Sequence, residues 1–226
     1  MESRKAKLMH RLEPEILSEG SGGWQQRKSA ELRRLVLEAA IDGLVERGYA
    51  GLSTLRVAEA AGIPRATVAH HFPTRLSLVE AVVDYAFYRR MEHFLADFAT
   101  ATVPAENQLE VATDKHWQST LTREYAAYLE LAIAARTDTE LGAYFNEAAK
   151  RYDRIWSEEM TRSFPQWEEK WQQLQVASDL AMAVHMGLLI NRPVLEGDDR
   201  LDEVRRVVCR VVEALHAGQF RKPGAL

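Results

Sequence analysis

Residues 53–72 decide the fold, and their sequence is STLRVAEAAGIPRATVAHHF. The first half carries a small apolar face at helical spacing, made by Val57, Ala58 and Ala61. Gly62 permits the positive φ angle that a tight turn between two helices requires. Pro64 suits the start of the next helix, where its missing N–H costs nothing. We therefore expect two short helices joined by a tight turn, a helix-turn-helix, between Thr54 and Phe72.

The second of these helices has two different faces. Val68 and Phe72 lie four residues apart, so both are expected to face the core. The outward positions are small or hydrogen-bonding: Arg65, Ala66, Thr67, Ala69, His70 and His71. Such a surface enters a DNA major groove without bulk and meets base edges and phosphates. The stretch therefore predicts DNA binding.

Helical patterns continue on both sides of this stretch. From Arg27 onward, one stripe of apolar residues is expected to be buried: Leu32, Leu35, Val36, Ala39, Ala40, Leu44 and Val45. Gly48 lies where a C-terminal cap glycine is common. Thr74 can cap a further long helix, whose apolar positions begin at Leu78 and Val79. These segments complete a three-helix head and start the body of the protein.

The rest of the chain also reads as helix. The expected segments are Asn107–Ser119, Thr122–Arg136, Thr139–Phe164, Gln166–Asn191 and Asp198–His216. Breaks are expected at prolines, including Pro165 and Pro193. The sequence predicts an all-α fold of about nine helices. Three regions follow: a flexible N-terminal arm over 1–26, ending in the glycine-rich run SEGSGG at 18–23; a helix-turn-helix DNA-binding domain over 27–75; and a helical effector-binding and dimerisation domain over 76–226.

Charge and composition narrow the class of protein. The 226-residue chain has a net charge of -4, but residues 24–75 hold eight Lys and Arg against five Asp and Glu. A basic N-terminal module on an acidic body suits DNA contact, which needs one cationic face. No uninterrupted apolar run approaches the roughly 18 residues that span a bilayer, and the N-terminus lacks the apolar core of a secretory signal. With Cys209 as the single cysteine, a cytoplasmic protein without membrane partners is expected.

The region from Lys28 to Leu78 resembles the TetR family of bacterial regulators. The resemblance rests on the amphipathic first helix, Gly48-Tyr49, the core from Thr54 to Ile63, Thr67-Val68, the ending His70-His71-Phe72, and Thr74-Arg75 before Leu78. It implies a helix-turn-helix head followed by a larger helical body. It also implies regulation of transcription, most often repression, with activation left open.

Three positions depart from the family's usual pattern. Ala69 stands where a tyrosine commonly touches the phosphate backbone, so that contact is lost. Pro64 replaces a serine, which removes a side-chain cap and a phosphate contact. Arg75 replaces a lysine and keeps the positive charge. These differences put the operator sequence and its affinity in doubt, but not the fold.

Transferred position by position, the resemblance supplies a set of DNA-binding candidates. Base-edge contacts are expected from Arg65, Ala66, Thr67 and His70. Phosphate contacts are expected from Thr54, His71, Thr74 and Arg75. Arg27 and Lys28, which precede the first helix, are expected to contact an adjacent phosphate or the minor groove. Thr54 and Thr74 can equally act only as helix caps, and His71 can instead pack inside the head.

The resemblance further implies a homodimer built from the last two long helices and a pocket for a small-molecule effector. The apolar stripes of these helices are wide enough for a dimer, although they can also complete the monomer core. The candidate ligand-binding residues are Phe94, His116, Trp117, Tyr125, Tyr128, Phe145, Tyr152, Trp156, Met182 and His185. Aromatic residues at such spacing are also common in plain cores. If they line a pocket, its effector is apolar or aromatic.

Two other classes of function compete with the regulator. An enzyme is not expected, because the chain has no phosphate-cradling glycine loop or nucleophile motif, and no catalytic residue or cofactor is assigned. Adjacent helical residues point about 100° apart, so His70 and His71 do not share a metal ion well and no metal site is expected. A helical carrier or partner-binding protein of the same fold, without specific DNA readout, stays open.

Overall fold

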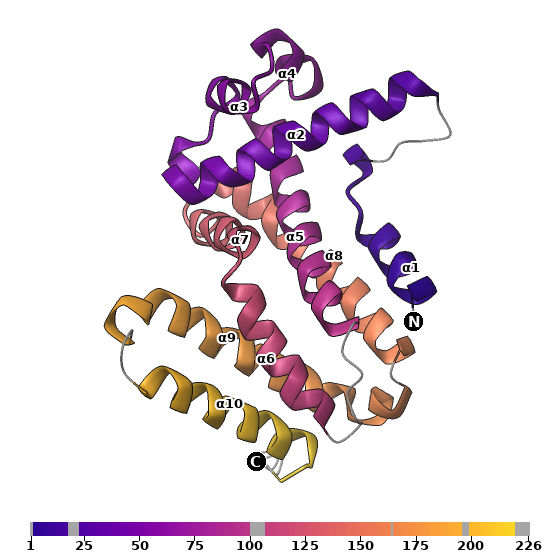
Figure 1. The fold of residues 1–226 in the computed structure, drawn as a ribbon, viewed down its shortest axis with the longest axis vertical. Helices are drawn as coiled ribbons and strands as arrows, with labels where there is room; N and C mark the ends of the chain where they lie inside the picture. Colours follow the sequence, from indigo (N-terminus) through magenta and orange to yellow (C-terminus); the bar gives the residue numbers. More distant parts are fainter. Residues whose placement is uncertain (1, 18–22, 100–106, 164, 196–198, 220–226) are drawn as a thin grey trace. The chain divides into compact units, whose positions relative to one another are not determined.

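The computed structural model describes residues 2–17, 23–99, 107–163, 165–195 and 199–219, and every regular element in these ranges is a helix (Figure 1). The α-helices are α1 (Glu2–Leu12), α2 (Trp24–Arg47), α3 (Thr54–Ala61), α4 (Arg65–His71), α5 (Arg75–Ala99), α6 (Gln108–Thr120), α7 (Arg123–Ala134), α8 (Thr139–Ser163), α9 (Trp171–Leu195) and α10 (Arg200–His216). Short 3-10 helices lie at η1 (Glu15–Leu17), η2 (Tyr49–Gly51) and η4 (Pro165–Lys170). The predicted all-α fold is confirmed.

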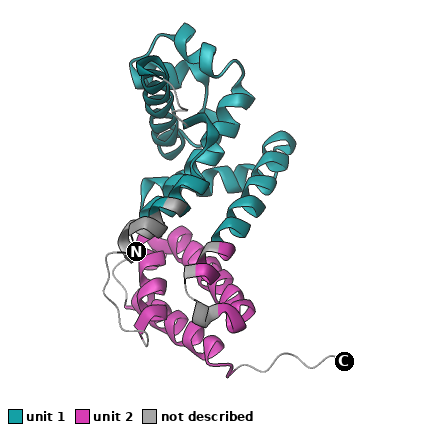
Figure 2. Cartoon of the chain, turned by 90° about the vertical axis from the view of Figure 1, so that its right-hand side faces the viewer, with its two compact units in different colours: residues 1–93, 122–156 teal, residues 94–121, 157–226 magenta. Residues whose placement is uncertain are grey.

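The chain divides into two compact units (Figure 2). Unit 1 contains residues 1–93 and 122–156, and unit 2 contains residues 94–121 and 157–226. The helix-turn-helix therefore shares a unit with α7 and most of α5 and α8. The sequence analysis placed a boundary at residue 75, but Leu78, Val79 and Val82 beyond it are fully buried in the core. The start of α5 thus completes the head as well as the body.

The N-terminal segment differs from the flexible arm that the sequence led us to expect. Residues 2–12 form α1, and Leu8, Leu12 and Leu17 are buried. Leu8 and Leu12 lie four residues apart, so one side of the short helix is apolar. The Tyr152 hydroxyl donates a hydrogen bond of 3.0 Å to the Leu12 carbonyl, which ties the segment to α8. The leucine spacing therefore decides the structure of this segment, despite its polar composition. The glycine-rich residues 18–22 lie outside the described residues.

The buried face of α2 contains other residues than predicted. Leu35 and Val45 are 54% and 44% exposed, although the sequence analysis placed both in the core. Their places are taken by Leu37 and Ile41, which are fully buried beside Val36. A helix of 24 residues packed on several neighbours has no single straight apolar face, so periodicity alone assigned the wrong members.

Unit 2 is built around α6, α9 and α10. Its core contains Ala177, Ala181, Val208 and Val212, and Leu109 of α6 packs against them. Helix α9 continues past the predicted end at Asn191 and carries Pro193 within its last turn. The proline is tolerated there because only one helical hydrogen bond is lost near a terminus.

One described segment, Glu168–Leu195, is long and apolar enough to cross a membrane by length and composition alone. Polar side chains interrupt it, so it was not visible as a continuous apolar run. Only 28% of its most apolar window is buried. Much of the apolar surface of α9 therefore faces outward from the chain.

Candidate nucleic-acid interface

The turn between α3 and α4 has the geometry that its sequence predicts. The Ser53 hydroxyl caps α3 by accepting from the Arg56 N–H at 3.3 Å, which leaves Thr54 as the first helical residue. Gly62 ends α3 at φ 66° and ψ 28°, in the left-handed region that side chains rarely adopt. The N–H of Ile63 then donates to the Ala58 carbonyl at 3.0 Å. These bonds set the angle at which α4 leaves α3.

Helix α4 presents the outward surface that the sequence analysis assigned to DNA. Val68 is fully buried and Phe72 is 1% exposed, and together they fix the inner face. Arg65, Ala66 and His70 are exposed, and Thr67 is partly exposed. The structure therefore brings the four base-edge candidates onto the accessible part of one short helix, close to α3 and α2 (Figure 1).

The structure gives Arg75 a role inside the head. Its guanidinium carbon lies 4.5 Å from the centre of the Tyr49 ring. The same group donates to the Leu52 carbonyl at 3.2 Å and to the Tyr49 hydroxyl at 3.0 Å. Tyr49 in turn donates to Asp138 at 2.8 Å, at the start of α8. Arg75 is exposed but already bound, so any phosphate contact competes with these bonds.

The other phosphate candidates are spread around α4. Thr74 caps α5, because its hydroxyl accepts from the Ser77 N–H at 3.0 Å, and its side chain is exposed. Arg27 and Lys28 are exposed in the first turn of α2, where the Lys28 amine lies 5.0 Å from the Trp24 ring centre. His71 is partly buried, and burial together with the charge of Arg33 lowers the pKa of its imidazole. A neutral His71 suits packing better than phosphate binding.

A charged cluster joins the first helix of the head to α5 and α7. It consists of Glu38, Arg89, Arg123 and Glu124. Arg89 lies 3.6 Å from Glu38 and 3.5 Å from Glu124, and Arg123 lies 3.1 Å from Glu124. Arg123 also bonds to Glu38. Burial favours the neutral form of Glu124, but its backbone hydrogen bond and the nearby positive charges outweigh burial and lower its pKa. The sequence analysis did not find this cluster.

The ten ligand-binding candidates fall into two groups. Unit 1 holds Tyr125, Tyr128, Phe145, Tyr152 and Trp156, and unit 2 holds Phe94, His116, Trp117, Met182 and His185. Each group is described by itself.

In unit 1 most of these residues form one aromatic cluster with Phe87, which the sequence analysis missed as a site residue. The Phe87 ring centre lies 4.8 Å from that of Tyr152, 5.2 Å from that of Tyr128 and 5.3 Å from that of Phe145. Tyr125 packs on Tyr128 at 5.6 Å. Burial raises the pKa of the Tyr125 phenol to about 12. Arg90 completes the cluster, and its position three residues after Phe87 on the same helical face was the available sequence signal.

In unit 2 two histidines pair across α6 and α9. The Nδ1 atoms of His116 and His185 lie 2.8 Å apart, a hydrogen bond in which one ring donates. Trp117 packs edge-on against His185 at 5.5 Å. His185 is 1% exposed. Its burial and the charge of Arg205 lower the pKa of His185 to about 4, which favours the neutral form of this ring. No group of three metal-ligating side chains occurs within the described ranges.

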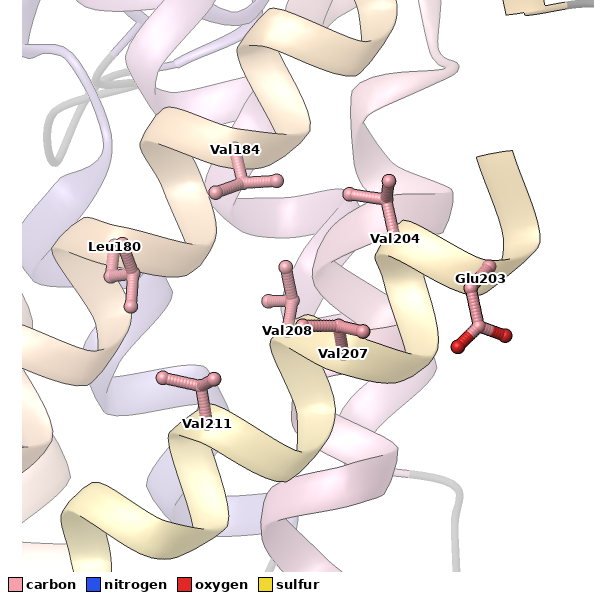
Figure 3. A pocket seen from close by; sticks show the side chains of 7 residues that line it. All are labelled: Leu180, Val184, Glu203, Val204, Val207, Val208 and Val211. Atoms are coloured by element: carbon pink, nitrogen blue, oxygen red, sulfur yellow. The ribbon is translucent and has the colours of Figure 1, made fainter. Parts of the chain in front are cut away.

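The last two helices carry an apolar groove on their outer side. It has a volume of about 270 Å³ and is lined by Leu180, Val184, Glu203, Val204, Val207, Val208 and Val211. Figure 3 shows Val204, Val208 and Val211 of α10 directed toward α9, while Glu203 points away. Leu180 is 38% exposed and Val207 42%. The wide stripes expected from the sequence therefore divide into an inner part that forms the core and an outer part that stays exposed.

Comparison with known proteins agrees with this geometry. Residues 36–82 match the family of bacterial regulatory proteins called the tetR family. The chain is 30% identical over 117 residues to the HTH-type transcriptional regulator CymR of Pseudomonas putida, a match covering 52% of this chain and 57% of that protein. It is 32% identical over 118 residues to an HTH-type transcriptional regulator of Mycobacterium bovis, covering 52% and 59%. The matched region thus spans less than two thirds of each relative.

The fold extends the similarity over most of the chain. A TetR-family regulator of Mesorhizobium loti superimposes with a TM-score of 0.64 at 17% identity, over 84% of this chain and 96% of that one. All three proteins are described as transcriptional regulators, and none of the three as an enzyme. With its helix-turn-helix and all-helical body, the chain is similar to the tetR family of bacterial regulatory proteins, whose family model it matches over residues 36–82.

Proposed function

We propose that this protein is a homodimeric transcription regulator that binds a palindromic operator and is released from it by a small apolar or aromatic effector. The single observation that carries the proposal is the accessible face of α4, with Arg65, Thr67 and His70 held outward by the buried Val68 and Phe72. A short helix set by a tight turn and exposing hydrogen-bonding groups is the element that reads a major groove. Repression is favoured over activation because the family mostly represses.

Dimerisation through α9 and α10 is supported by their exposed apolar surface. Val176, Ile190 and Val194 of α9 are 56%, 59% and 70% exposed, and the valine groove lies beside them. A second copy of the same surface would cover both and bury apolar side chains that otherwise face water. Dimerisation also accounts for the low burial of the apolar segment Glu168–Leu195 within one chain. A dimer that covers this segment suits a protein of the cytoplasm.

Release by an effector is supported by the connections of the head. The charged cluster links α2 to α5 and α7, and the Arg75–Tyr49–Asp138 contacts link the helix-turn-helix to α8. A ligand that moves α5, α7 or α8 would therefore move the head. Such release requires the effector to bind the DNA-incompetent state more tightly.

The proposal is tested by selecting bound fragments from genomic DNA and measuring binding to the recovered sequence at two salt concentrations. A near-palindrome bound at about nanomolar affinity, with binding that weakens steeply as salt rises, is the expected result. A matched duplex with one half-site scrambled serves as the control and should bind more weakly. Weak binding that ignores sequence would contradict the proposal and favour the helical carrier of the same fold.

A further inference from the structure

Arg90 of α5 lies among aromatic rings and lacks an anionic partner in the described part of the chain. Its guanidinium carbon is 4.2 Å from the Tyr128 ring centre, 5.5 Å from that of Phe87 and 5.7 Å from that of Tyr125. Its Nη1 atom is buried and has no hydrogen-bond partner. A buried donor without an acceptor costs about 1–3 kcal/mol, and more when it is charged. The rings offset part of this cost but do not accept its hydrogen bonds.

The neighbouring Arg89 shows that the fold supplies carboxylates where an arginine is only structural. Arg89 faces Glu38 at 3.6 Å and Glu124 at 3.5 Å, and it also pairs with Glu92. Two consecutive arginines on one helix therefore differ in whether they have anionic partners. Arg89 is neutralised by the chain itself, whereas Arg90 keeps one buried donor, Nη1, that has no acceptor among the described residues.

The chemistry around Arg90 defines what would satisfy it. A guanidinium matches a carboxylate because two parallel N–H groups meet two oxygens. Phe87 and Tyr125 are 2% and 0% exposed, whereas Arg90 and Tyr128 are partly exposed. The guanidinium thus lies at the border between the rings and solvent. A carboxylate reaching Arg90 would have its carbon body directed against the faces of the rings.

We propose that Arg90 and the surrounding rings Phe87, Tyr125 and Tyr128 bind the carboxylate end of an aromatic acid. This assignment rests on the proposed function, because it names the chemical class of the effector. Tyr152 and Phe145 extend the ring surface by packing against Phe87. The ring centres are only 4.8–5.7 Å apart, so the rings must separate for a ligand body to enter. That movement involves α5, α7 and α8, the helices bonded to the head.

The test uses three aromatic acids of increasing size, which are benzoate, 3-phenylpropionate and 1-naphthoate, with their neutral amides as isosteric controls. Binding to the full chain is measured by calorimetry and by the ligand-induced rise in Tm at about 10 mM ligand. We expect at least one acid to bind and its amide to bind about tenfold or more weakly. Equal binding of acid and amide, or binding of none of the acids, would overturn the proposal.

Variants separate a ligand role from a packing role. Arg90→Met should weaken the acid at least about tenfold, and Arg90→Lys should retain part of the binding, because a lysine keeps the charge but not the fork. Arg154→Met removes an exposed cation from α8 of the same unit and should behave like the unchanged protein. Without ligand, Arg90→Met should have an equal or higher Tm, because it removes a buried charge that lacks a partner. A Tm lowered by more than about 5 °C, or acid binding unchanged in Arg90→Met, would assign Arg90 to packing alone.

The same samples distinguish this proposal from the proposed function. Operator binding with no acid binding overturns only the assignment of Arg90. Acid binding without binding of any selected DNA supports the site and overturns the regulator.

Discussion

The outer surface of α4 and the outer surface of α9 and α10 are both exposed, yet their chemistry is opposite. Helix α4 exposes Arg65, whose guanidinium donates hydrogen bonds, and His70, whose ring both donates and accepts them. The surface of α9 and α10 exposes valine, leucine and isoleucine around an apolar groove. Hydrogen-bonding groups lose little by staying in water until a partner arrives, whereas a large apolar patch is unfavourable whenever it stays uncovered. Under the proposed function, α4 has a transient partner, the operator, and α9 and α10 have a permanent one, the second copy.

The largest effect should follow from charging the permanent surface. Val207→Asp places a carboxylate in the apolar groove, and burying it against a second copy would be costly. We expect a monomer by analytical ultracentrifugation and a loss of operator affinity of at least about 100-fold, because one head alone reaches one half-site. Ile133→Asp, which charges an exposed position of α7 in unit 1, is the control. If Val207→Asp stays dimeric, the groove is not the interface.

A smaller effect is expected at the transient surface. Arg65→Ala should weaken operator binding about 10- to 100-fold and relax the preference at one base pair, because a base-edge contact contributes about 1–3 kcal/mol. The dimer should be unaffected. Arg47→Ala, which removes an exposed cation from the far end of α2, serves as the comparison in a binding assay on operator variants. A uniform loss over all base substitutions would reassign Arg65 to phosphate contact.

The contact between the head and α8 should have a measurable but modest stability effect. Tyr49→Phe keeps the ring under Arg75 but removes the hydroxyl that bonds to Arg75 and Asp138. We expect a Tm lower by about 2–4 °C in a thermal scan. Tyr144→Phe, which removes one hydroxyl bonded to Asp84, measures the ordinary cost of such a change in the same unit. A Tm unchanged in Tyr49→Phe alone would show that the Arg75 contacts do not hold the head.

The smallest effect on stability should come from the buried face of α9, which carries a titratable histidine, whereas the exposed face is apolar. His185 has a folded pKa of about 4, below its ordinary value of 6.5, because of burial and the charge of Arg205. Its neutral form is thus favoured by folding, so this stability is present above pH 6.5 and is lost as pH falls from 6.5 toward 4. Tm should fall between pH 7.5 and pH 5, and less so in His185→Gln.

The pH dependence of Tm must be compared with that of His185→Gln, because protonation of other histidines also lowers stability as the pH falls. The pKa values of His71 and His216 are also lowered by burial. The difference between the two proteins isolates His185. An identical pH dependence in both would show that the His116–His185 pair does not sense protonation.

The head was predictable from sequence because its determinants are local. The turn at Gly62, the buried pair Val68 and Phe72 and the outward face of α4 each follow from spacing within 20 residues. Ser53 and Thr54 both carry a hydroxyl that can cap α3, and the structure gives this role to Ser53.

The body was less predictable because its decisive contacts join distant residues. Arg89 and Arg90 are indistinguishable in the sequence, and only packing against α2 and α7 separates their surroundings. The N-terminal helix was missed for a similar reason, since its observed bond to α8 joins Leu12 to Tyr152, which lies 140 residues further along the chain. The sequence identified aromatic residues as candidates for a ligand site, but it did not show which of them pack together in one cluster.

The hydroxyl of Tyr152 has a consequence for following this protein in solution. It lies 3.0 Å from both the Leu12 carbonyl and the Asp84 carbonyl, while its ring is stacked 4.8 Å from Phe87. Any displacement of that ring alters how the N-terminal helix is held. A fluorescent label on the exposed His10 would turn the first helix into an optical sensor of events at the aromatic rings, without DNA in the sample. An affinity tag fused ahead of this helix would pull on the same Tyr152–Leu12 hydrogen bond. The position of a tag should therefore be varied in experiments on this chain.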